Sequence, residues 1–313
     1  MSDILIGTSG YDYPEWKNVF YPPELKRKDF LSYYASQFNA LEVNNTFYAM
    51  PTAARLLSLY ERSEGKLQFS IKANRLLTHE IGALWQNEAE DFRTAVRPLL
   101  ENSVLCSVLF QFPQSFHYTA DNRFYLAKLL ADFSEFPVSV EFRHKEWIRP
   151  SVFEGLDKRG ASLVFCDMPQ LKYLPAAEVS EKGINAVAPF IGPVAYIRLH
   201  GRNADAWYVK DSGNGGGPEN SGSSGNGSAR YTYDYSDDEL WQFVPVIKSA
   251  VLTGKRPVVF FNNHPNGSGA LNAKKLGAML ATEQRSRAGR YLSSECPEAQ
   301  KVSEQLRTQS PSL

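Results

Sequence analysis

Short apolar runs typical of buried β-strands recur along the chain, and amphipathic segments with apolar residues at helical spacing separate them. The segments KDFLSYYASQF, TAARLLSLYERS, DFRTAVRPLLEN and NRFYLAKLLADF show the helical spacing most clearly. A further helix is expected to begin at Ser236, because Glu239 three places later completes a capping box. The strand candidates are residues 4–8, 40–46, 68–73, 104–112, 138–143, 162–167, 194–200 and 258–263.

This alternation of strands and helices determines the expected fold class. Eight strand–helix repeats within about 280 residues predict an α/β fold of the (β/α)8 TIM-barrel type. An open, doubly wound sheet is the alternative, and it favours a GxGxxG motif after the first strand. The first turn reads Gly7-Thr8-Ser9-Gly10 instead, so we expect the barrel.

Two segments fall outside the repeat. Gly, Ser and Asn supply 15 of the 20 residues from 211 to 230, which is the composition of a flexible loop. Because this insertion follows the seventh strand, we expect it to overhang the carboxyl-terminal rim of the barrel. We therefore expect one barrel domain over residues 1–283, which includes the insertion, and a polar tail over residues 284–313.

Composition narrows the expected partners and compartment. The 34 Lys and Arg residues balance 34 Asp and Glu residues, so no global field draws the chain to nucleic acid or to an anionic membrane. The three cysteines lie far apart and form no CxxC pair, which argues against a disulfide framework and a zinc knuckle. The sequence shows neither a secretory leader pattern nor a run of about 18 apolar residues. We therefore expect a cytoplasmic protein without a membrane partner.

Polar residues stand at the ends of seven of the eight predicted strands, where β/α barrels place their active sites. Several form pairs two residues apart, such as Glu42 with Asn44, and so share one face of a strand. We expect them to converge on one opening of mixed charge, where pKa values shift. The catalytic candidates are Glu42, Lys72, Glu141, Asp167 and His200. The substrate-binding candidates are Thr8, Tyr11, Asn44, Gln111, Arg143, Arg198, Arg202, Asn262, Asn263 and His264.

The chemistry of these residues assigns roles to some of them. Glu141 and His200 are the preferred base and acid, because their strands are far enough apart to flank a substrate. Lys72 can stabilise a developing oxyanion or, if desolvated, form a Schiff base. The segments LHGRN and NNHPNGSGALNAKKL follow strands seven and eight, where barrels often bind phosphate through helix amide groups. Sugar hydroxyls or a carboxylate can use the same donors.

Two aromatic stretches border the predicted strand ends. The aromatic residues of GYDYPEW, after the first strand, either wall a pocket or pack on the first helix. Tyr231, Tyr233 and Tyr235 alternate after the insertion, which suits one face of an extended segment. Packing is favoured for these three rings over stacking on a sugar or base.

Several motifs resemble those of one known family in the same order. They are GTSGYDYPEW, FYPPELKRKDFLSYYASQFNALEVNNTFYAMP, FSIKANRLLTHE, FQFPQSF, VEFRHKEW, YIRLHGRN and VVFFNNHPNGSGALNAKKL. Together they resemble the YecE-like family, the domain of unknown function 72, over about residues 4 to 283. The resemblance implies a β/α barrel but no activity, and the Gly-rich insertion looks long for the family.

We expect an enzyme that uses acid/base chemistry, as an isomerase, lyase or hydrolase, on a small anionic or sugar-like, phosphorylated or unphosphorylated, substrate. No cofactor is predicted. A divalent metal on Glu42, Glu141, Asp167 and His200 is the alternative, although neighbouring cations argue against it. Such a metal would suit a phosphodiesterase of the endonuclease IV type acting on nucleic acid, which is an analogy of fold alone. A third alternative is a non-catalytic ligand-binding or scaffold protein.

Overall fold

The computed structural model describes residues 4–175, 178–180, 183–185, 190–208 and 229–292. Nine parallel strands form one sheet in the order β6-β5-β4-β3-β2-β1-β11-β10-β7. The strands are β1 (Leu5–Ser9), β2 (Ala40–Val43), β3 (Gln68–Lys72), β4 (Leu105–Phe112), β5 (Val138–Phe142), β6 (Ser162–Leu163), β7 (Phe165–Asp167), β10 (Val194–Leu199) and β11 (Arg256–Phe261).

The two ends of the sheet order belong to one segment of chain, and this closes the barrel. β6 pairs with β5, and β7 pairs with β10. Only Val164 separates β6 from β7, and its amide donates to the carbonyl of Val140 on β5 at 2.9 Å. The nine strands therefore fill eight positions of a nearly closed α/β barrel of the TIM type, which confirms the predicted fold class.

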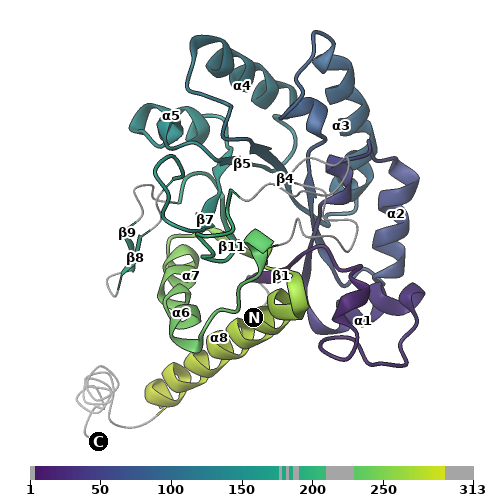
Figure 1. Ribbon diagram of the computed structural model, residues 1–313, viewed down its shortest axis with the longest axis vertical. Coiled ribbons are helices and arrows are strands. Elements are labelled where there is room, and N and C mark those ends of the chain that lie inside the picture. Colours follow the sequence, from purple (N-terminus) through teal and green to yellow (C-terminus); the bar gives the residue numbers. More distant parts are fainter. Residues whose placement is uncertain (1–3, 176–177, 181–182, 186–189, 209–228, 293–313) are drawn as a thin grey trace, which may run out of the picture.

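Helices surround the strands (Figure 1). They are α1 (Phe30–Gln37), α2 (Ala53–Arg62), α3 (Trp85–Glu101), α4 (Ala120–Asp132), α5 (Pro150–Asp157), α6 (Asp237–Trp241), α7 (Phe243–Leu252) and α8 (Ser268–Leu292). The strand–helix repeat fails at one place in the described chain. Between β7 and β10 the described segments form an antiparallel pair, β8 (Glu178–Ser180) with β9 (Gly183–Asn185), and no helix.

Side-chain caps set the start of several helices, as the sequence predicted for one of them. Ser236 accepts from the amide of Glu239, whose carboxylate accepts from the amide of Ser236, so the capping box is confirmed. Thr52 caps α2 by accepting from the amide of Arg55, and Thr119 caps α4 by accepting from the amide of Asn122. The helix predicted from Ser236 is two helices, because α6 ends at Trp241 and α7 begins two residues later.

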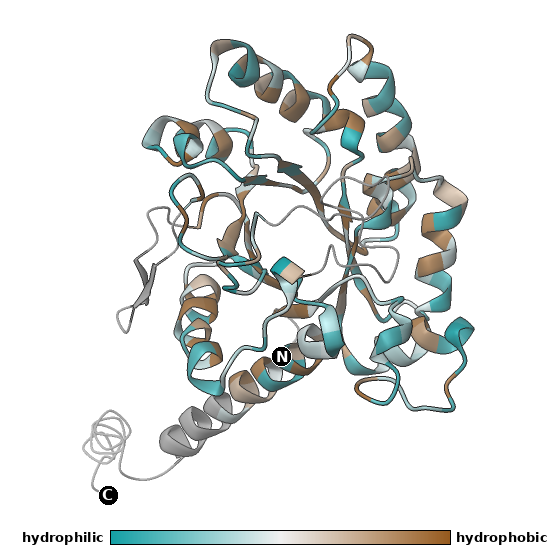
Figure 2. Cartoon of the chain, viewed as in Figure 1, coloured by the Kyte–Doolittle hydropathy of each residue, from teal (hydrophilic) through white to brown (hydrophobic). Residues whose placement is uncertain are grey.

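Residues alternate between two apolar regions along each strand. One set points into the barrel, where Leu5, Cys106, Tyr196, Val258 and Phe260 pack together. The other set points outward and packs against the helices, as Phe261 and Leu199 do. Figure 2 shows apolar residues concentrated on the strands and on the helix faces turned toward them. The same alternation decides which polar residues can reach the barrel opening.

Some predicted segments fall outside the described residues. Most of the Gly/Ser-rich insertion, predicted at 211–230, lies in the undescribed segment 209–228, and residues 293–313 of the predicted tail also lie outside. The predicted boundary at residue 283 falls within α8, which continues to Leu292. Among the described residues, none of the helices combines the length and apolar character that a membrane span requires.

Gly7 on β1 permits a close approach of β1 and β2. A Cβ atom at this position would lie 1.9 Å from the carbonyl oxygen of Ala40 and 2.8 Å from the hydroxyl of Tyr34. That hydroxyl accepts from the amide of Thr8 and donates to the carbonyl of Ala40, so it cannot move without breaking both bonds. Gly7 is thus required by the spacing between backbones.

We predict that Gly7→Ala lowers the free energy of unfolding by about 3 kcal/mol, because the added methyl group meets main-chain atoms. Urea denaturation measures this loss. Gly82→Ala is the matched control, since a Cβ at Gly82 has no neighbour within 4 Å. Equal stability of the two variants would contradict the packing described for β1 and β2.

Candidate active site

The inward positions at the carboxyl ends of the strands gather polar residues at one opening of the barrel, which we call the mouth. Most residues predicted for the site occupy these positions, because they lie two residues apart on their strands. The strand pairing brings together Glu42, Asn44, Lys72, Gln111, Glu141, Arg143, Arg198, His200 and Asn262.

Arg198 is bonded to two carboxylates in the barrel interior. Its Nη1 donates to Glu141 at 2.6 Å, and its Nη2 donates to Glu42 at 2.7 Å. The side chains of Glu42 and Glu141 are fully buried, and that of Arg198 is 2% exposed. These three residues, the central cluster, join strands β2, β5 and β10.

Two hydroxyl groups also donate hydrogen bonds to Glu42. Ser9 donates to its Oε1 at 2.5 Å, and Tyr196 donates to its Oε2 at 2.6 Å. The Ser70 hydroxyl lies 2.7 Å from that of Tyr196 and donates to it, because the Tyr196 proton is already given to Glu42. Each oxygen of Glu42 therefore has a partner, as a buried carboxylate requires.

Glu141 is held between two guanidinium groups. Arg143 donates from Nε to Oε1 of Glu141, while Arg198 occupies Oε2. Burial alone would raise the pKa of Glu141, but the charges of Arg143 and Arg198 hold this pKa well below its ordinary value. Because both oxygens are occupied and the carboxylate stays ionised, Glu141 is better suited to anchoring the two arginines than to accepting a proton.

His200 is completely buried beside Arg143. Burial and the nearby charges of Arg143 and Arg198 lower its pKa well below the ordinary value, so the ring is neutral near pH 7. Nη2 of Arg143 lies 3.2 Å from Nε2 of His200. A guanidinium group only donates, so Nε2 carries the lone pair and Nδ1 carries the proton. Nδ2 of the Asn262 side-chain amide lies 3.0 Å from Nδ1, and turning this amide by 180° presents its oxygen to the Nδ1 proton.

Lys72 and Gln111 also lie on the inward face, on β3 and β4. The ammonium group of Lys72 lies 4.1 Å from the centroid of the Phe47 ring, and its charge contributes to the lowered pKa of His200. Gln111 is buried and donates to the carbonyl of Phe112 at 3.1 Å. Lys72 thus lies on the inward face that also carries the central cluster.

Aromatic rings border the mouth above His200. Trp207 lies edge-on to His200, with 6.4 Å between ring centroids, and the Arg143 guanidinium lies 5.8 Å from the centroid of the Trp207 ring. Tyr231 lies 6.0 Å from His200 and 6.0 Å from His264. Tyr231 therefore faces the mouth, although its alternation with two other tyrosines favoured packing.

His264 has no hydrogen-bond partner among the described residues for either ring nitrogen, although it is buried. Tyr13 stacks on its ring with a centroid distance of 4.8 Å and an interplanar angle of 6°. Oδ1 of Asn44 and Nε of Arg198 are also buried without a described partner. Buried polar groups usually have partners, so these atoms are candidates for bonding to a ligand.

Asp167 does not join the central cluster, contrary to the sequence-based expectation. Its neighbour Cys166 occupies the inward position, so the Asp167 carboxylate points outward. Arg202 donates to it at 2.9 to 3.1 Å, and Tyr235 donates to it at 2.6 Å. Arg202 also donates to Glu239, so Asp167 and Arg202 tie β7 to α6 rather than serving the mouth.

Three further substrate-binding candidates also lie away from the mouth. Thr8 points toward α1 and bonds to the Tyr34 hydroxyl at 3.0 Å. The ring of Tyr11 lies 6.2 Å from the ring of Tyr34 on α1, measured between centroids. Asn263 donates to Asn272 and to the carbonyl of Tyr233. Each of these side chains occupies the layer between the strands and the helices.

The segments LHGRN and NNHPNGSGALNAKKL, which were predicted to bind phosphate, offer fewer free donors than their composition suggested. The amide of Gly267 donates to the carbonyl of His264, and that of Gly269 donates to the carbonyl of Asn263. Arg202, which was expected to add charge there, is paired with carboxylates. The described backbone therefore does not leave these amides free for phosphate.

The four residues considered for a divalent metal do not form one site. Glu42 and Glu141 are bonded to arginines, and Asp167 lies in a separate network. Cys166 instead approaches Glu141 and His200, with possible ligand atoms within 4.8 Å of one another. Burial raises the pKa of the Cys166 thiol well above its ordinary value, and Arg143 and Arg198 stand beside the carboxylate. This environment favours a neutral thiol and disfavours a cation.

Sequence reasoning missed Cys166, Tyr196 and Trp207. Tyr196 lies two residues before Arg198, so the alternation that selected Arg198 could also have placed it inward. No such pattern marks Cys166. The polar residue that ends strand six is its neighbour Asp167, so sequence reasoning selected Asp167 instead. Trp207 comes from the loop after β10, whose path no local pattern specifies.

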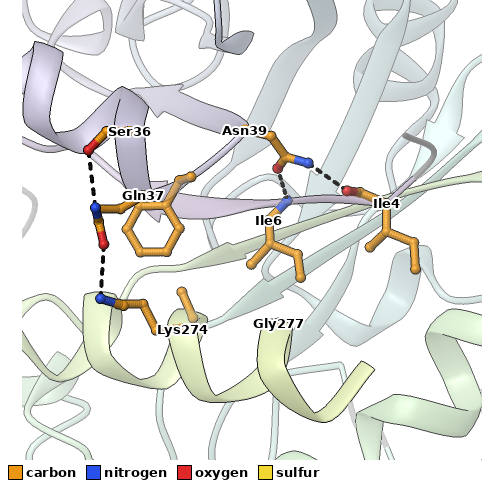
Figure 3. Close-up of a pocket in the computed structure, with 9 residues that line it drawn as sticks. Ile4, Ile6, Ser36, Gln37, Asn39, Lys274 and Gly277 are labelled. Atoms are coloured by element: carbon orange, nitrogen blue, oxygen red, sulfur yellow. Dashed lines mark hydrogen bonds between the residues drawn. The ribbon is translucent and has the colours of Figure 1, made fainter. Parts of the chain in front are cut away.

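A groove of about 440 Å³ lies elsewhere, on the outer wall of the barrel between α1 and α8 (Figure 3). Its lining includes Ile4 and Ile6, and Asn39 bonds to the backbone of both. Lys274 is the one ionisable residue of this lining, and it donates to Gln37 at 2.9 Å. The groove lacks the paired acids, bases and cations of the mouth, so we place the candidate site at the mouth.

Comparison with known families agrees with this architecture. The family model described as "Protein of unknown function DUF72" matches residues 5–300. The chain belongs to the DUF72 family. The resemblance found in the sequence motifs is thereby confirmed, and membership in DUF72 assigns no activity.

Individual relatives cover almost the whole chain. The UPF0759 protein YunF of Bacillus subtilis (strain 168) is 27% identical over 299 residues, covering 92% of this chain and 99% of YunF. The crystal structure of a DUF72 family protein from Thermotoga maritima is 30% identical, with a TM-score of 0.73, and covers 89% of this chain and 99% of that one. A DUF72 structure from Enterococcus faecalis V583, at 23% identity and a TM-score of 0.71, covers 89% and 95% and shows the shared fold.

The buried His264 makes the stability of this DUF72 protein depend on pH. Burial lowers the pKa of His264 to about 4, whereas an unfolded histidine titrates near 6.5. Between these values the unfolded chain binds a proton that the folded chain does not, so stability falls as the pH falls. His264 alone accounts for a loss of about 3 kcal/mol across this window.

We predict that His264→Phe, which retains a stacking ring, makes the decline in unfolding free energy from pH 6.5 to pH 4 smaller by about 3 kcal/mol. Urea titrations at stepped pH measure this decline. His117→Gln is the control, because the side chain of His117 is 54% exposed. The same decline in the wild type and His264→Phe would show that His264 is solvated in the folded chain.

Proposed function

We propose that the protein is an enzyme whose mouth binds a small anionic substrate and moves a proton on it. The observation that carries this proposal is the charge of the inward side chains. Lys72, Arg143 and Arg198 face two carboxylates, Glu42 and Glu141, so among these five described side chains the cations exceed the anions by one. A low-dielectric mouth with this charge attracts a carboxylate or phosphate group.

Arg143 is the residue best placed to hold the anion. Its described hydrogen bonds use Nε and Nη2, so Nη1 has no partner among the described residues. Its side chain is 11% exposed, whereas that of Arg198 is 2% exposed and bonded to both carboxylates. Arg143 can therefore reach a ligand without breaking the central cluster.

The rings around the mouth fit the body of such a substrate. Trp207, Tyr231 and His264 offer flat surfaces on which a sugar or another small ring can lie. The unpartnered nitrogens of His264 and Oδ1 of Asn44 can bond to its hydroxyl groups. A polyhydroxylated anion, such as a sugar acid or sugar phosphate, uses both kinds of contact.

His200 is the proposed proton carrier, and the substrate itself adjusts its basicity. In the free protein the neighbouring arginines lower the pKa of His200, so the ring is a weak base. An anion bound at Arg143 would lie beside Nε2 and raise this pKa, because it stabilises the imidazolium form. Once Nη2 of Arg143 turns from Nε2 to the anion, the Nε2 lone pair of His200 accepts a proton from the substrate and returns it, which suits isomerase, lyase or hydrolase chemistry.

The alternatives have less support from the described residues. A metal-dependent phosphodiesterase needs carboxylates that can bind a cation, but those of the mouth are bonded to arginines. A scaffold role for the Gly/Ser-rich insertion concerns residues outside the described chain.

We predict that inorganic phosphate raises the melting temperature of the wild type relative to chloride at equal ionic strength. At ten times the Kd the stabilisation is about 1.4 kcal/mol. Arg143→Gln should abolish it and Lys72→Met should weaken it, because each removes a cation from the mouth. Arg27→Gln is the matched control, since Arg27 lies on the surface and pairs with Asp12.

His200→Gln separates binding from chemistry. For any sugar acid or sugar phosphate that the wild type converts, this variant should keep the phosphate-dependent stabilisation and lower kcat by about 10²- to 10⁴-fold. Phosphate stabilisation that survives in Arg143→Gln would contradict the binding proposal. Unchanged turnover in His200→Gln would contradict the assigned proton carrier.

A further inference from the structure

A second group of possible ligands lies at the rim, separate from the central cluster. His117 follows β4, and His144 and Glu146 follow β5, the neighbouring strand in the sheet. One ligand atom from each residue lies within 4.8 Å of the others. No sequence pattern predicted this proximity, because His117 and His144 are 27 positions apart and belong to different loops.

Buried contacts hold the two loops in place. The indole of Trp147 donates to the carbonyl of Phe116 at 2.6 Å, and the two rings stack with 5.2 Å between centroids. Phe116 directly precedes His117, and Trp147 directly follows Glu146. The ligand group is therefore positioned by a rigid core rather than by its own contacts.

The two distances from Glu146 to the histidines are those of ligands around one ion. Oε2 of Glu146 lies 3.4 Å from Nδ1 of His117 and 3.5 Å from Nδ1 of His144. Hydrogen bonds between such atoms are normally near 2.8 Å, so both distances are long for direct bonds. Ligand atoms about 2.1 Å from a tetrahedral zinc ion are about 3.4 Å apart.

The donor atoms are chemically suited to a metal. Nδ1 of His144 carries a lone pair, because a backbone amide is directed at it. That nitrogen accepts from the amide of Glu146 at 3.3 Å, a long cap bond that a metal would replace. Among the described residues, the ion pairs of Glu146 are with the two histidines alone, whereas arginines surround Glu141 and its neighbours.

We propose that His117, His144 and Glu146 bind zinc or a similar divalent transition metal. Two imidazoles and one carboxylate are a common ligand set for these ions, with water in the remaining positions. His117 and Glu146 are about half exposed, with 54% and 45% of their side-chain surfaces accessible, so the ion can enter from solvent. The bound ion joins the loop after β4 to the loop after β5 at the rim.

Isothermal titration of the full-length, chelator-treated protein with zinc chloride tests this site. We expect one zinc ion per chain, with an affinity at least ten-fold lower in His117→Ala and in Glu146→Gln. Both residues are exposed, so these variants should fold, and circular dichroism checks that they do. His79→Ala, which removes a histidine outside the group, should bind zinc as the wild type does.

Cobalt spectroscopy distinguishes this site from the buried group of Glu141, Cys166 and His200. Binding at the rim gives visible cobalt bands without a thiolate-to-metal charge-transfer band, and Cys166→Ser leaves them unchanged. A thiolate band, a loss of affinity in Cys166→Ser, full affinity in His117→Ala and Glu146→Gln, or no zinc binding by the wild type would each overturn the proposal.

Discussion

The bonding of Arg198 to two buried carboxylates is the interaction on which the interior of this barrel depends. Glu42, Glu141 and Arg198 come from three different strands and have almost no contact with water. Removing one partner of such a group leaves a buried charge without compensation, at a cost of about 3–5 kcal/mol. The central cluster therefore fixes the relative positions of β2, β5 and β10 and the charge of the mouth above them.

That bonding also determines what the remaining residues can do. Because Arg198 and Arg143 occupy the oxygens of Glu141, this carboxylate is an anchor, and the proposed proton carrier is the neutral His200. The cations and the aromatic rings at the mouth are the basis on which we propose a small anionic substrate with a ring or several hydroxyl groups. The proposed metal site at the rim uses different residues, so either proposal can fail without the other.

Strand alternation made much of the site predictable from sequence. Pairs two residues apart, such as Glu141 with Arg143 and Arg198 with His200, point to the same side, and the fold turns that side inward. The rule failed at strand six, where the chain places Cys166 inward and Asp167 outward. It also could not foresee the outward bonds of Arg202, which depend on α6. Nor could it foresee the nearness of His117 to Glu146, which depends on the pairing of β4 with β5 and on the paths of the loops that follow them.

A crystal structure of the protein grown with inorganic phosphate tests the central claim most directly. The account predicts phosphate oxygens within hydrogen-bonding distance of the Arg143 guanidinium and near the Lys72 ammonium. Arg198 should remain bonded to Glu42 and Glu141 in the same structure. Phosphate bound only elsewhere, or an Arg198 side chain that leaves either carboxylate to reach the anion, would contradict the account.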